Sequence, residues 1–291
     1  MKHLVLLSFL AALTSLPAQA QELGGRLKRI KETATFVVAH GETAIPFSYM
    51  DKSGPVGFGP DISRQVAEGL KARLGMKELK IRWNPVTLST RFPLMVTNTI
   101  DIECITTTNT RARQELVSFS NNFYISDEGI ATRRDSGIKD YPDLAGKRVA
   151  VVRGTTTERS LQGSGMNMSM VAERNNRRAM AALAEGRADA YIAAAPIIAG
   201  ELVRLADASP FHVVGSGRYK EAFACTLPKG DTEYKKTIDE ILAGMMQGGD
   251  MERLYNKWFT GPVPPLARKI GIPLDDNNRR LYQAHNDTPF E

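Results

Sequence analysis

One short pattern occurs twice in this sequence, and the repeat limits the folds that the chain can adopt. Residues 91–102 predict a short helix, a turn and a strand, and residues 179–190 repeat that layout. In each copy an aspartate, Asp101 or Asp189, stands three positions after the turn residue. One helix–turn–strand unit in each half of the chain predicts two similar α/β lobes.

Hydrophobic spacing predicts several further elements. Apolar residues recur every four positions over 62–74, which predicts a helix that opens at Pro60-Asp61. Residues 232–247 predict a second long helix, and residues 36–40 predict a buried strand. The cluster Lys257-Trp258-Phe259 is interpreted as core packing rather than as a ligand platform.

The first 20 residues have the features of a secretory signal peptide. A short polar start is followed by an apolar run from Leu4 to Leu13, and Ala18-Gln19-Ala20 is an A-x-A cleavage site. The apolar run is shorter than the roughly 20 residues that a membrane span requires. We therefore expect residues 1–20 to be removed after Ala20, which leaves a secreted soluble protein.

The distribution of charge excludes some classes of function. The formal net charge is +6, but the basic residues are spread among acidic ones, and no zinc-ligand spacing or aromatic-plus-basic array is present. Nucleic acid is therefore not an expected partner. The modest positive charge favours anionic ligands or a membrane surface. Neither a metal cluster nor a glycine-rich nucleotide loop is visible, so no metal and no cofactor are predicted.

Two cysteines remain after the signal peptide, Cys104 and Cys225. In an oxidising compartment such a pair favours one disulfide, and the alternative is two buried free thiols. The bridge would close a loop of over a hundred residues. The chain-entropy model gives a stabilisation of about 4–5 kcal/mol for such a loop.

Two segments have the residue types of an anion-binding site. Residues 104–113 combine short hydroxyl side chains with Arg113, whose planar guanidinium can clamp a carboxylate with two hydrogen bonds. The alternative is a threonine-rich strand edge with a solvated arginine. Thr155 and Glu158 have the spacing of a capping box, so a helix with free N–H groups should begin there. Such a helix start can hold an anion or serve as a cap alone.

Several short segments occur in an order and spacing that together carry a resemblance. They are Pro46-Phe47-Ser48-Tyr49, Thr87 through Pro93, Glu103-Cys104 through Asn109, Arg113 to Phe119-Ser120, Gly154-Thr155-Thr156, Cys225, and Lys257-Trp258-Phe259 with Pro262-Val263-Pro264-Pro265. From about Ile30 to its C-terminus the chain resembles bacterial solute-binding family 3, the periplasmic substrate-binding proteins of polar amino-acid ABC transporters. Within that family it is most similar to the glutamate/aspartate-binding branch.

The resemblance implies a fold and its division. It implies the two-lobed periplasmic-binding-protein fold (type II), an α/β fold in which two crossing strands join the lobes and the ligand lies in the cleft between them. The crossings are expected near Ser126–Ala131 and Ala222–Thr226. The first lobe would then comprise residues 34–128 plus 224–291, and the second lobe residues 129–223.

The resemblance also implies a set of ligand-binding residues. Arg113 matches the arginine that binds the ligand's α-carboxylate. The other matching positions carry groups that suit negative charge, and they are Arg91, Thr106, Thr108, Thr155 and Thr156. Asn176 completes the set, in place of a histidine.

The departures from the pattern concern the ligand rather than the fold. Gly41 stands where the branch has an arginine directed at the distal carboxylate, and Leu88 replaces a serine. Ala194-Ala195 occupies the place of an acidic pair, one member of which holds the ammonium group. A buried ammonium group without an anionic partner is unfavourable by several kcal/mol. The expected ligand is therefore a carboxylate without an amine, or an amine held by neutral carbonyls, Asn176 or water.

The leading functional prediction is a monomeric transport receptor in the periplasm. It would bind glutamate, aspartate or a related dicarboxylate, close, and dock on an ABC permease in the inner membrane, without any chemistry. One alternative is an enzyme on the same scaffold, similar to cyclohexadienyl dehydratase. That enzyme would need a general acid from among Glu128, Glu158 and Glu173, each of which is better explained as a solvated, hinge or capping residue. The other alternative is a solute sensor for a receptor partner.

Overall fold

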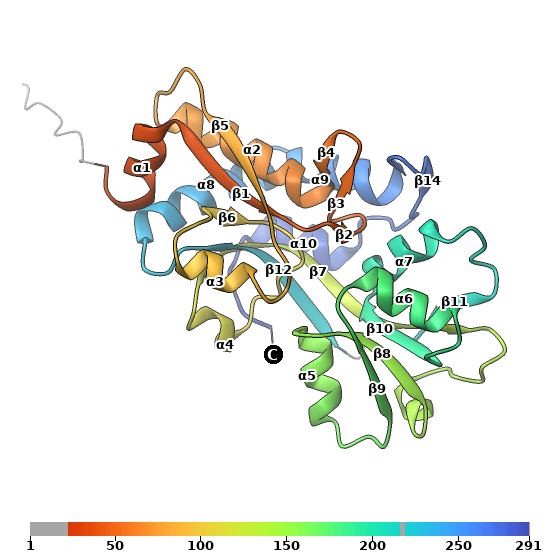
Figure 1. The fold of residues 1–291 in the computed structure, drawn as a ribbon. Coiled ribbons are helices and arrows are strands. Elements are labelled where there is room, and N and C mark those ends of the chain that lie inside the picture. The colour runs from red at the N-terminus through yellow and green to blue at the C-terminus, as the bar shows by residue number, and fades with distance from the viewer. Residues whose placement is uncertain (1–22, 216–218, 291) are drawn as a thin grey trace, which may run out of the picture.

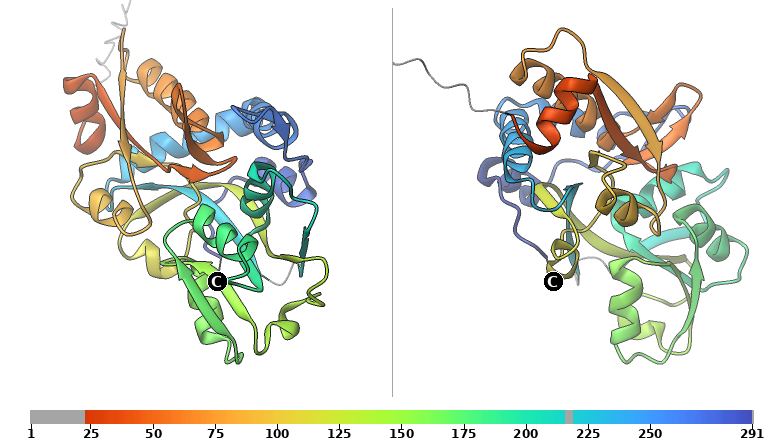
Figure 2. Two further views of the ribbon diagram at one scale, coloured as in Figure 1. Left: turned by 45° about the vertical axis from the view of Figure 1, so that its right-hand side comes forward. Right: turned by 60° about the vertical axis from the view of Figure 1, so that its left-hand side comes forward.

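The computed structural model describes residues 23–215 and 219–290. The predicted signal peptide, residues 1–20, lies outside these described residues. No helix within 23–215 or 219–290 is long and apolar enough to cross a membrane. Two groups of helices and strands lie one above the other in Figure 1, and the right-hand view of Figure 2 shows shared strands running between them.

A mixed sheet runs through both groups. Its outer strands on each side are parallel, as βαβ connections require, and the two central strands are antiparallel. The order across the sheet is β5 (Lys80–Pro85), β1 (Thr35–His40), β6 (Ile102–Glu103), β12 (Lys220–Leu227), β7 (Ser118–Arg133), β10 (Ala190–Ala194), β8 (Arg148–Val152) and β9 (Ser169–Glu173), with β11 (Phe211–Val214) also paired to β7.

The long strand β7 joins the two lobes. Its first part pairs with β12 from Ser118 opposite Leu227 to Asp127 opposite Lys220. From Glu128 onward its partner is β10 instead, and β11 pairs with its end. The two parts of β7 thus pair with different sets of strands. The predicted two-lobed α/β architecture with crossing strands is confirmed.

Helices of the first lobe bury an aromatic core against the crossing strands. Phe47 lies at its centre, with its ring centroid 5.0 Å from that of Tyr124 on β7 and 5.4 Å from that of Phe223 on β12. Trp258 and Phe259 are also buried, which confirms the core interpretation for these two residues, whereas Lys257 is exposed and forms an ion pair with Asp61 at 2.7 Å. The helical elements of this lobe are α1 (Gly25–Thr33), α2 (Phe58–Arg73), α3 (Arg91–Val96), α4 (Arg111–Gln114), α8 (Thr232–Gln247), α9 (Asp250–Tyr255), a π-helical turn (Asn256–Thr260) and α10 (Asp276–Ala284).

Two small antiparallel sheets complete the first lobe. One contains β2 (Thr43–Ala44), β3 (Ser48–Asp51) and β4 (Gly54–Val56), and the other is the hairpin of β13 (Pro262–Val263) and β14 (Arg268–Lys269).

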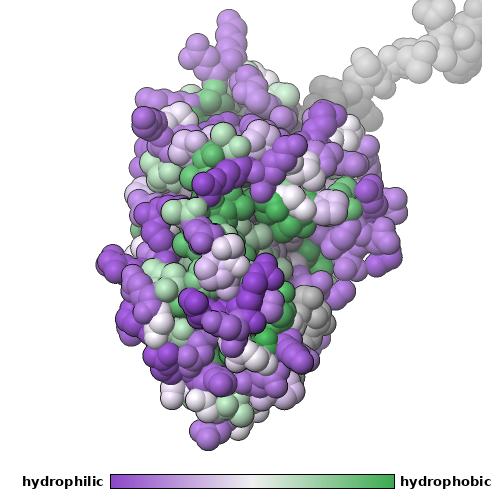
Figure 3. All heavy atoms as spheres, turned by 90° about the vertical axis from the view of Figure 1, so that its right-hand side faces the viewer, coloured by the Kyte–Doolittle hydropathy of each residue, from purple (hydrophilic) through white to green (hydrophobic). Residues whose placement is uncertain are grey.

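The second lobe touches the first through α7. Its helical elements are a 3-10 turn (Tyr141–Leu144), α5 (Thr156–Gly163), α6 (Asn176–Ala184) and α7 (Ala195–Arg204). The approach of α7 to the first lobe is so close that a Cβ on Gly200 would lie 2.2 Å from the backbone oxygen of Ile45. On the face shown in Figure 3, hydrophobic side chains gather across the middle of the molecule, between hydrophilic surfaces above and below.

The predicted repeat is present in both lobes and agrees in its hydrogen bonds. In the first lobe, Asp101 follows α3, donates its N–H to the carbonyl oxygen of Val37 at 2.8 Å and accepts from the Val37 N–H at 2.6 Å. In the second lobe, Asp189 follows α6 and exchanges the same pair of bonds with Arg148, both at 2.8 Å. Each aspartate thus fixes the start of its strand beside the neighbouring parallel strand.

Candidate functional site

A cavity of about 610 Å³ lies between the two lobes. Its lining includes all seven residues that the resemblance assigned to the ligand. Ten of its polar residues form two walls, one from each lobe. The first wall consists of Arg91, Glu103, Thr106, Thr108 and Arg113, and the second wall consists of Arg153, Thr155, Thr156, Arg174 and Asn176.

Arg113 is a buried cation that has no carboxylate partner among the described residues. It lies in α4, its side chain is buried, and the whole residue is 4% exposed. One guanidinium nitrogen donates to the carbonyl oxygen of Thr108 at 2.9 Å and another to that of Gly154, across the cleft, at 3.4 Å. Burial, followed by the nearby charge of Arg91, lowers the pKa of Arg113 to about 9. Its environment is not that of the solvated arginine in the alternative interpretation.

Arg91 is equally buried but has an anionic partner. Its Nη1 donates to Thr107 Oγ1 at 2.8 Å and lies 3.8 Å from Glu103 Oε1. Glu103 is buried and accepts from the hydroxyls of Thr107 and Thr226, each at 2.7 Å. Of the two buried guanidinium groups in the first wall, Arg91 is therefore paired with a carboxylate, whereas Arg113 forms no ion pair with the described residues.

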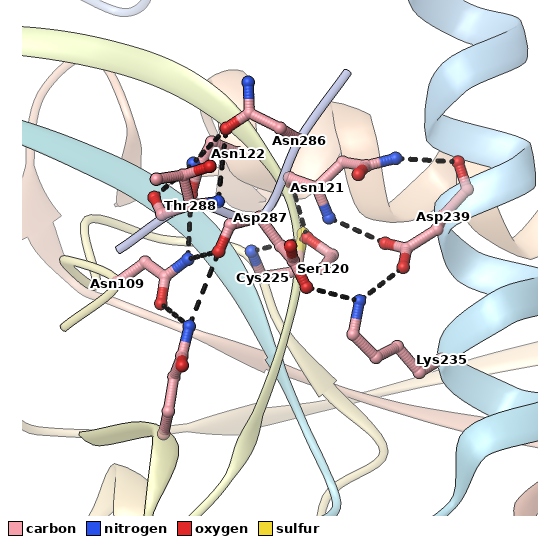
Figure 4. A network of polar contacts seen from close by, with 11 residues as sticks. Asn109, Ser120, Asn121, Asn122, Cys225, Lys235, Asp239, Asn286, Asp287 and Thr288 are labelled. Carbon is pink, nitrogen blue, oxygen red and sulfur yellow. Dashed lines mark hydrogen bonds and ion pairs between the residues drawn. The ribbon is translucent and has the colours of Figure 1, made fainter. Parts of the chain in front are cut away.

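Two connections attach the loop that carries Thr106 and Thr108 to other parts of the first lobe. The Cys104–Cys225 disulfide, with its sulfur atoms 2.07 Å apart, ties the start of the loop to β12 and confirms the predicted bridge. Asn109 donates its side-chain amide to the carbonyl oxygen of Asp287 at 2.8 Å, within the network of Figure 4 that joins the C-terminal segment to β7. This second connection was not predicted from the sequence.

The second wall begins at the start of α5. Thr155 Oγ1 accepts from the N–H of Glu158 at 3.1 Å, which confirms the predicted cap, and the Glu158 carboxylate accepts from the N–H of Gly154 at 2.8 Å. Thr156 Oγ1 lies 3.3 Å from Thr108 Oγ1 of the first wall. The two predicted hydroxyl groups therefore meet across the cleft.

This side is completed by Asn176 of α6 and by two arginines that were not among the predicted site residues. Asn176 lines the cavity and accepts from the Tyr191 hydroxyl at 2.9 Å. Arg153 and Arg174 are exposed and form no ion pair with any residue in the described ranges. A signal was available, because each follows the last residue of a parallel strand, β8 or β9, and the carboxyl ends of such strands face the ligand crevice.

Glu221, an acid inside the cavity, was also not among the predicted site residues. It is half-buried on β12, and its Oε1 accepts from the hydroxyls of Thr108, at 3.0 Å, and of Thr156. The predicted crossing segment begins at Ala222. Because β12 begins at Lys220, Glu221 belongs to the strand and lies between the two walls.

The three acids considered for an enzyme do not line the cavity. Glu128 accepts from the hydroxyls of Tyr141 and Thr157, and burial raises its pKa. The Glu158 carboxylate accepts from the N–H of Gly154 just before α5, and the side chain of Glu173 forms an ion pair with an arginine at 2.8 Å. Within the described ranges, no group of three or more histidine, cysteine or acidic side chains is arranged to hold a metal ion.

The positions that depart from the acidic-ligand pattern lie at the same cavity. Gly41, Leu88 and Ala194 line it, whereas Ala195 does not. Ile192, Ala193 and Ile197 lie beside Ala194 in the lining, so this part of the second lobe presents an apolar surface to the ligand.

Comparisons with known proteins agree with this architecture. Residues 36–261 match the model of bacterial extracellular solute-binding proteins, family 3. An L-glutamate/L-aspartate-binding protein of Pseudomonas aeruginosa is 34% identical over 290 residues, which cover 98% of this chain and 96% of that protein. A glutamate/aspartate import solute-binding protein of Salmonella typhimurium is 33% identical over 273 residues, with coverages of 92% and 90%.

Solved structures share the fold. An ancestral amino acid-binding protein, a precursor of cyclohexadienyl dehydratase, matches with a TM-score of 0.71 at 28% identity, over 80% of this chain and 98% of that one. An ancestral arginine-binding protein bound to arginine matches with a TM-score of 0.70 at 26% identity, over 78% and 98%. The predicted two-lobed type II fold is confirmed. As the sequence resemblance predicted, the chain belongs to family 3 of the bacterial extracellular solute-binding proteins.

Proposed function

We propose that this protein is the periplasmic solute-binding component of an ABC importer and that its ligand is an acidic amino acid of the glutamate/aspartate type. The observation that carries the proposal is the buried guanidinium of Arg113, which has no carboxylate partner among the described residues. Burying a charge without a counter-charge is strongly unfavourable, so this position favours an anionic ligand. The names of the two curated relatives specify the same ligand class.

The charges of the lining support an acidic amino acid over other amino acids. Four arginines and three glutamates line the cavity, which is a formal net charge of +1. A glutamate or aspartate molecule carries two carboxylates and one ammonium group at neutral pH, a net charge of −1 that complements the site. The ancestral relative binds arginine, a cation, and that ligand would add to the positive charge here. When the Arg91–Glu103 pair is set aside, the lining charges are Arg113, Arg153 and Arg174 against Glu42 and Glu221.

We place the α-carboxylate of the ligand at Arg113, with Thr106 and Thr108 beside it. The N–H groups at the start of α5 would complete the anion site from the second lobe, where Thr155 and Thr156 line the cavity. The hydroxyls of Thr108 and Thr156 donate to Glu221, and that of Thr155 donates to the carbonyl oxygen of Val152. The distal carboxylate would lie toward Arg153 and Arg174. These arginines would supply the positive charge that the sequence pattern lacks at Gly41.

Transport would follow from closure of the lobes around the ligand. Contacts already cross the cleft from Arg113 to Gly154 and from Thr108 to Thr156, and a ligand that touches both walls would favour the closed arrangement. We propose the division of the lobes at 34–128 plus 224–291 and at 129–223, with α1 preceding this range and attached to the first lobe through the Arg26–Asp101 ion pair. The change of β7 partner after Asp127 supports the first boundary. We propose a monomer, because one chain supplies both walls.

A thermal-shift screen of refolded, ligand-stripped protein tests the proposal. The screen compares L-glutamate and L-aspartate with succinate, 2-oxoglutarate, L-glutamine and L-arginine. At 100 times Kd a ligand adds about 2.7 kcal/mol to the free energy of unfolding, which raises the melting temperature by several degrees. We expect an acidic amino acid to give the largest shift and L-arginine to give none. A larger shift with L-glutamine or L-arginine would overturn the proposal.

A further inference from the structure

We propose that Glu221 receives the α-ammonium group of the ligand, so that the site selects an amino acid over the amine-free dicarboxylate of the same length. This inference rests on the proposed function and adds an anionic group that the acidic-ligand pattern places elsewhere, at Ala194-Ala195. An ammonium group enclosed between two protein lobes needs a hydrogen-bonding anion, because desolvation removes its water partners.

The hydrogen bonds of Glu221 leave one of its oxygens available. Both hydroxyl groups that it binds, from Thr108 and Thr156, donate to the same oxygen, Oε1. Oε2 accepts no hydrogen bond from the described residues, and no arginine or lysine among them forms an ion pair with Glu221. Because an ionised carboxylate offers acceptor positions on both oxygens, Oε2 can accept from an ammonium group without breaking either threonine contact.

Glu221 also stands in the place that an amino acid requires relative to Arg113. Thr108 contacts both charged residues: its carbonyl oxygen accepts from Arg113 at 2.9 Å, and its hydroxyl donates to Glu221 at 3.0 Å. The carboxylate and the ammonium group of an amino acid are attached to one carbon atom. Their protein partners must therefore be a cation and an anion that face the same small volume. Thr108 holds Arg113 and Glu221 in this arrangement, because it forms a hydrogen bond with each of them.

The other two glutamates of the lining are less suited to this role. Glu103 is buried beside Arg91 and binds Thr107 and Thr226, so both of its oxygens are occupied. Glu42 is exposed and lies outside the two walls. Among the carboxylates of this cavity, Glu221 therefore combines a central position with an oxygen that has no partner within 23–215 and 219–290.

The test measures a ratio of two affinities. Isothermal titration calorimetry gives the Kd of L-glutamate and of L-2-hydroxyglutarate, in which a hydroxyl replaces the ammonium group, for the wild-type protein and for Glu221→Gln. A charge-assisted hydrogen bond lost from the site predicts about 10- to 100-fold weaker L-glutamate binding. L-2-hydroxyglutarate should bind Glu221→Gln at least as tightly as wild type. If the protein prefers aspartate, L-aspartate and L-malate form the matched pair.

Glu42→Gln is the control, because it removes a carboxylate from the same lining without removing the proposed acceptor. It should change both Kd values by a similar factor. Equal weakening of both ligands in Glu221→Gln would overturn the inference and leave Glu221 with a role in cleft structure. A wild-type preference for the hydroxy acid would also overturn it, while the acidic-solute site stands.

The proposed function fails separately, and the inference fails with it, if wild type binds neither member of either pair. Thermal melting of Glu221→Gln verifies folding. Should that variant not fold, Glu221→Asp provides the second test, because it keeps the charge but shortens its reach. Glu221→Asp should then lower the preference for the amino acid, and an unchanged preference would overturn the inference.

Discussion

The two walls of the cavity differ in their burial and in the connections that hold them to the rest of the protein. In the first wall, Arg91, Glu103, Thr108 and Arg113 are buried, and the loop between them is tied to β12 by a disulfide and to the C-terminal segment by hydrogen bonds. In the second wall none of the five residues is buried. The first wall is thus preorganised within its lobe, whereas the second wall presents its groups to the cleft.

This difference predicts a division of roles. A charge that the protein has already desolvated interacts with a ligand at low effective dielectric constant, and no further desolvation of that charge opposes binding. The first wall should therefore supply most of the affinity. The second wall should add smaller contributions that depend on closure and on salt, because its arginines remain in contact with solvent.

The largest expected effect concerns the disulfide that holds the first wall. Replacing Cys104 and Cys225 with serine opens a loop with a sequence separation of 121 residues. The free energy of unfolding should fall by about 4–5 kcal/mol, measured by urea denaturation. Reductant should destabilise the wild-type protein and leave the double variant unchanged. If the double variant were as stable as wild type, the bridge would not be what fixes the first wall.

The next effect concerns the buried cation of the first wall. Arg113→Ala removes the proposed carboxylate partner and should weaken ligand binding by about 2–5 kcal/mol, or roughly 30- to 4,000-fold in Kd. Arg113→Lys is the matched control, because it keeps a positive charge but loses the planar two-pronged donor, and it should fall between wild type and Arg113→Ala. Calorimetric titration with L-glutamate or L-aspartate measures both. Wild-type affinity in Arg113→Ala would place the carboxylate elsewhere.

Much of the fold was predictable from the sequence because it depends on local patterns. The four-residue spacing over 62–74 gave α2, and the segment 232–247 matches α8 at both ends. The repeat was predictable because the turn and its aspartate are close in sequence, so both copies are visible without any tertiary information. Resemblance placed all seven ligand-binding candidates at one cavity for a related reason, since their order along the chain is characteristic of the family.

The missed residues depend on contacts between distant segments. Glu221 meets Thr108 across 113 positions of sequence, and Asn109 meets Asp287 across 178. Neither pair leaves a local pattern. From the sequence, the ammonium partner was expected only in the segment around Ala194, where the resemblance located it. An acid on a crossing strand reaches the same cavity from another direction, so the absence of acids in one segment did not show their absence from the site.

The smallest expected effect concerns the second wall. Arg153→Ala and Arg174→Ala should each weaken binding by about 0.2–1 kcal/mol, because contacts of exposed arginines with a carboxylate are weak and are screened by ions. Kd values at low and at high salt provide the measurement. The loss of binding free energy caused by Arg153→Ala or Arg174→Ala should become smaller as the salt concentration rises. The loss caused by Arg113→Ala should stay the same, because Arg113 is desolvated. If Arg153→Ala or Arg174→Ala weakened binding as much as Arg113→Ala at both salt concentrations, that arginine would be desolvated on closure, and the second wall would hold its carboxylate as tightly as the first.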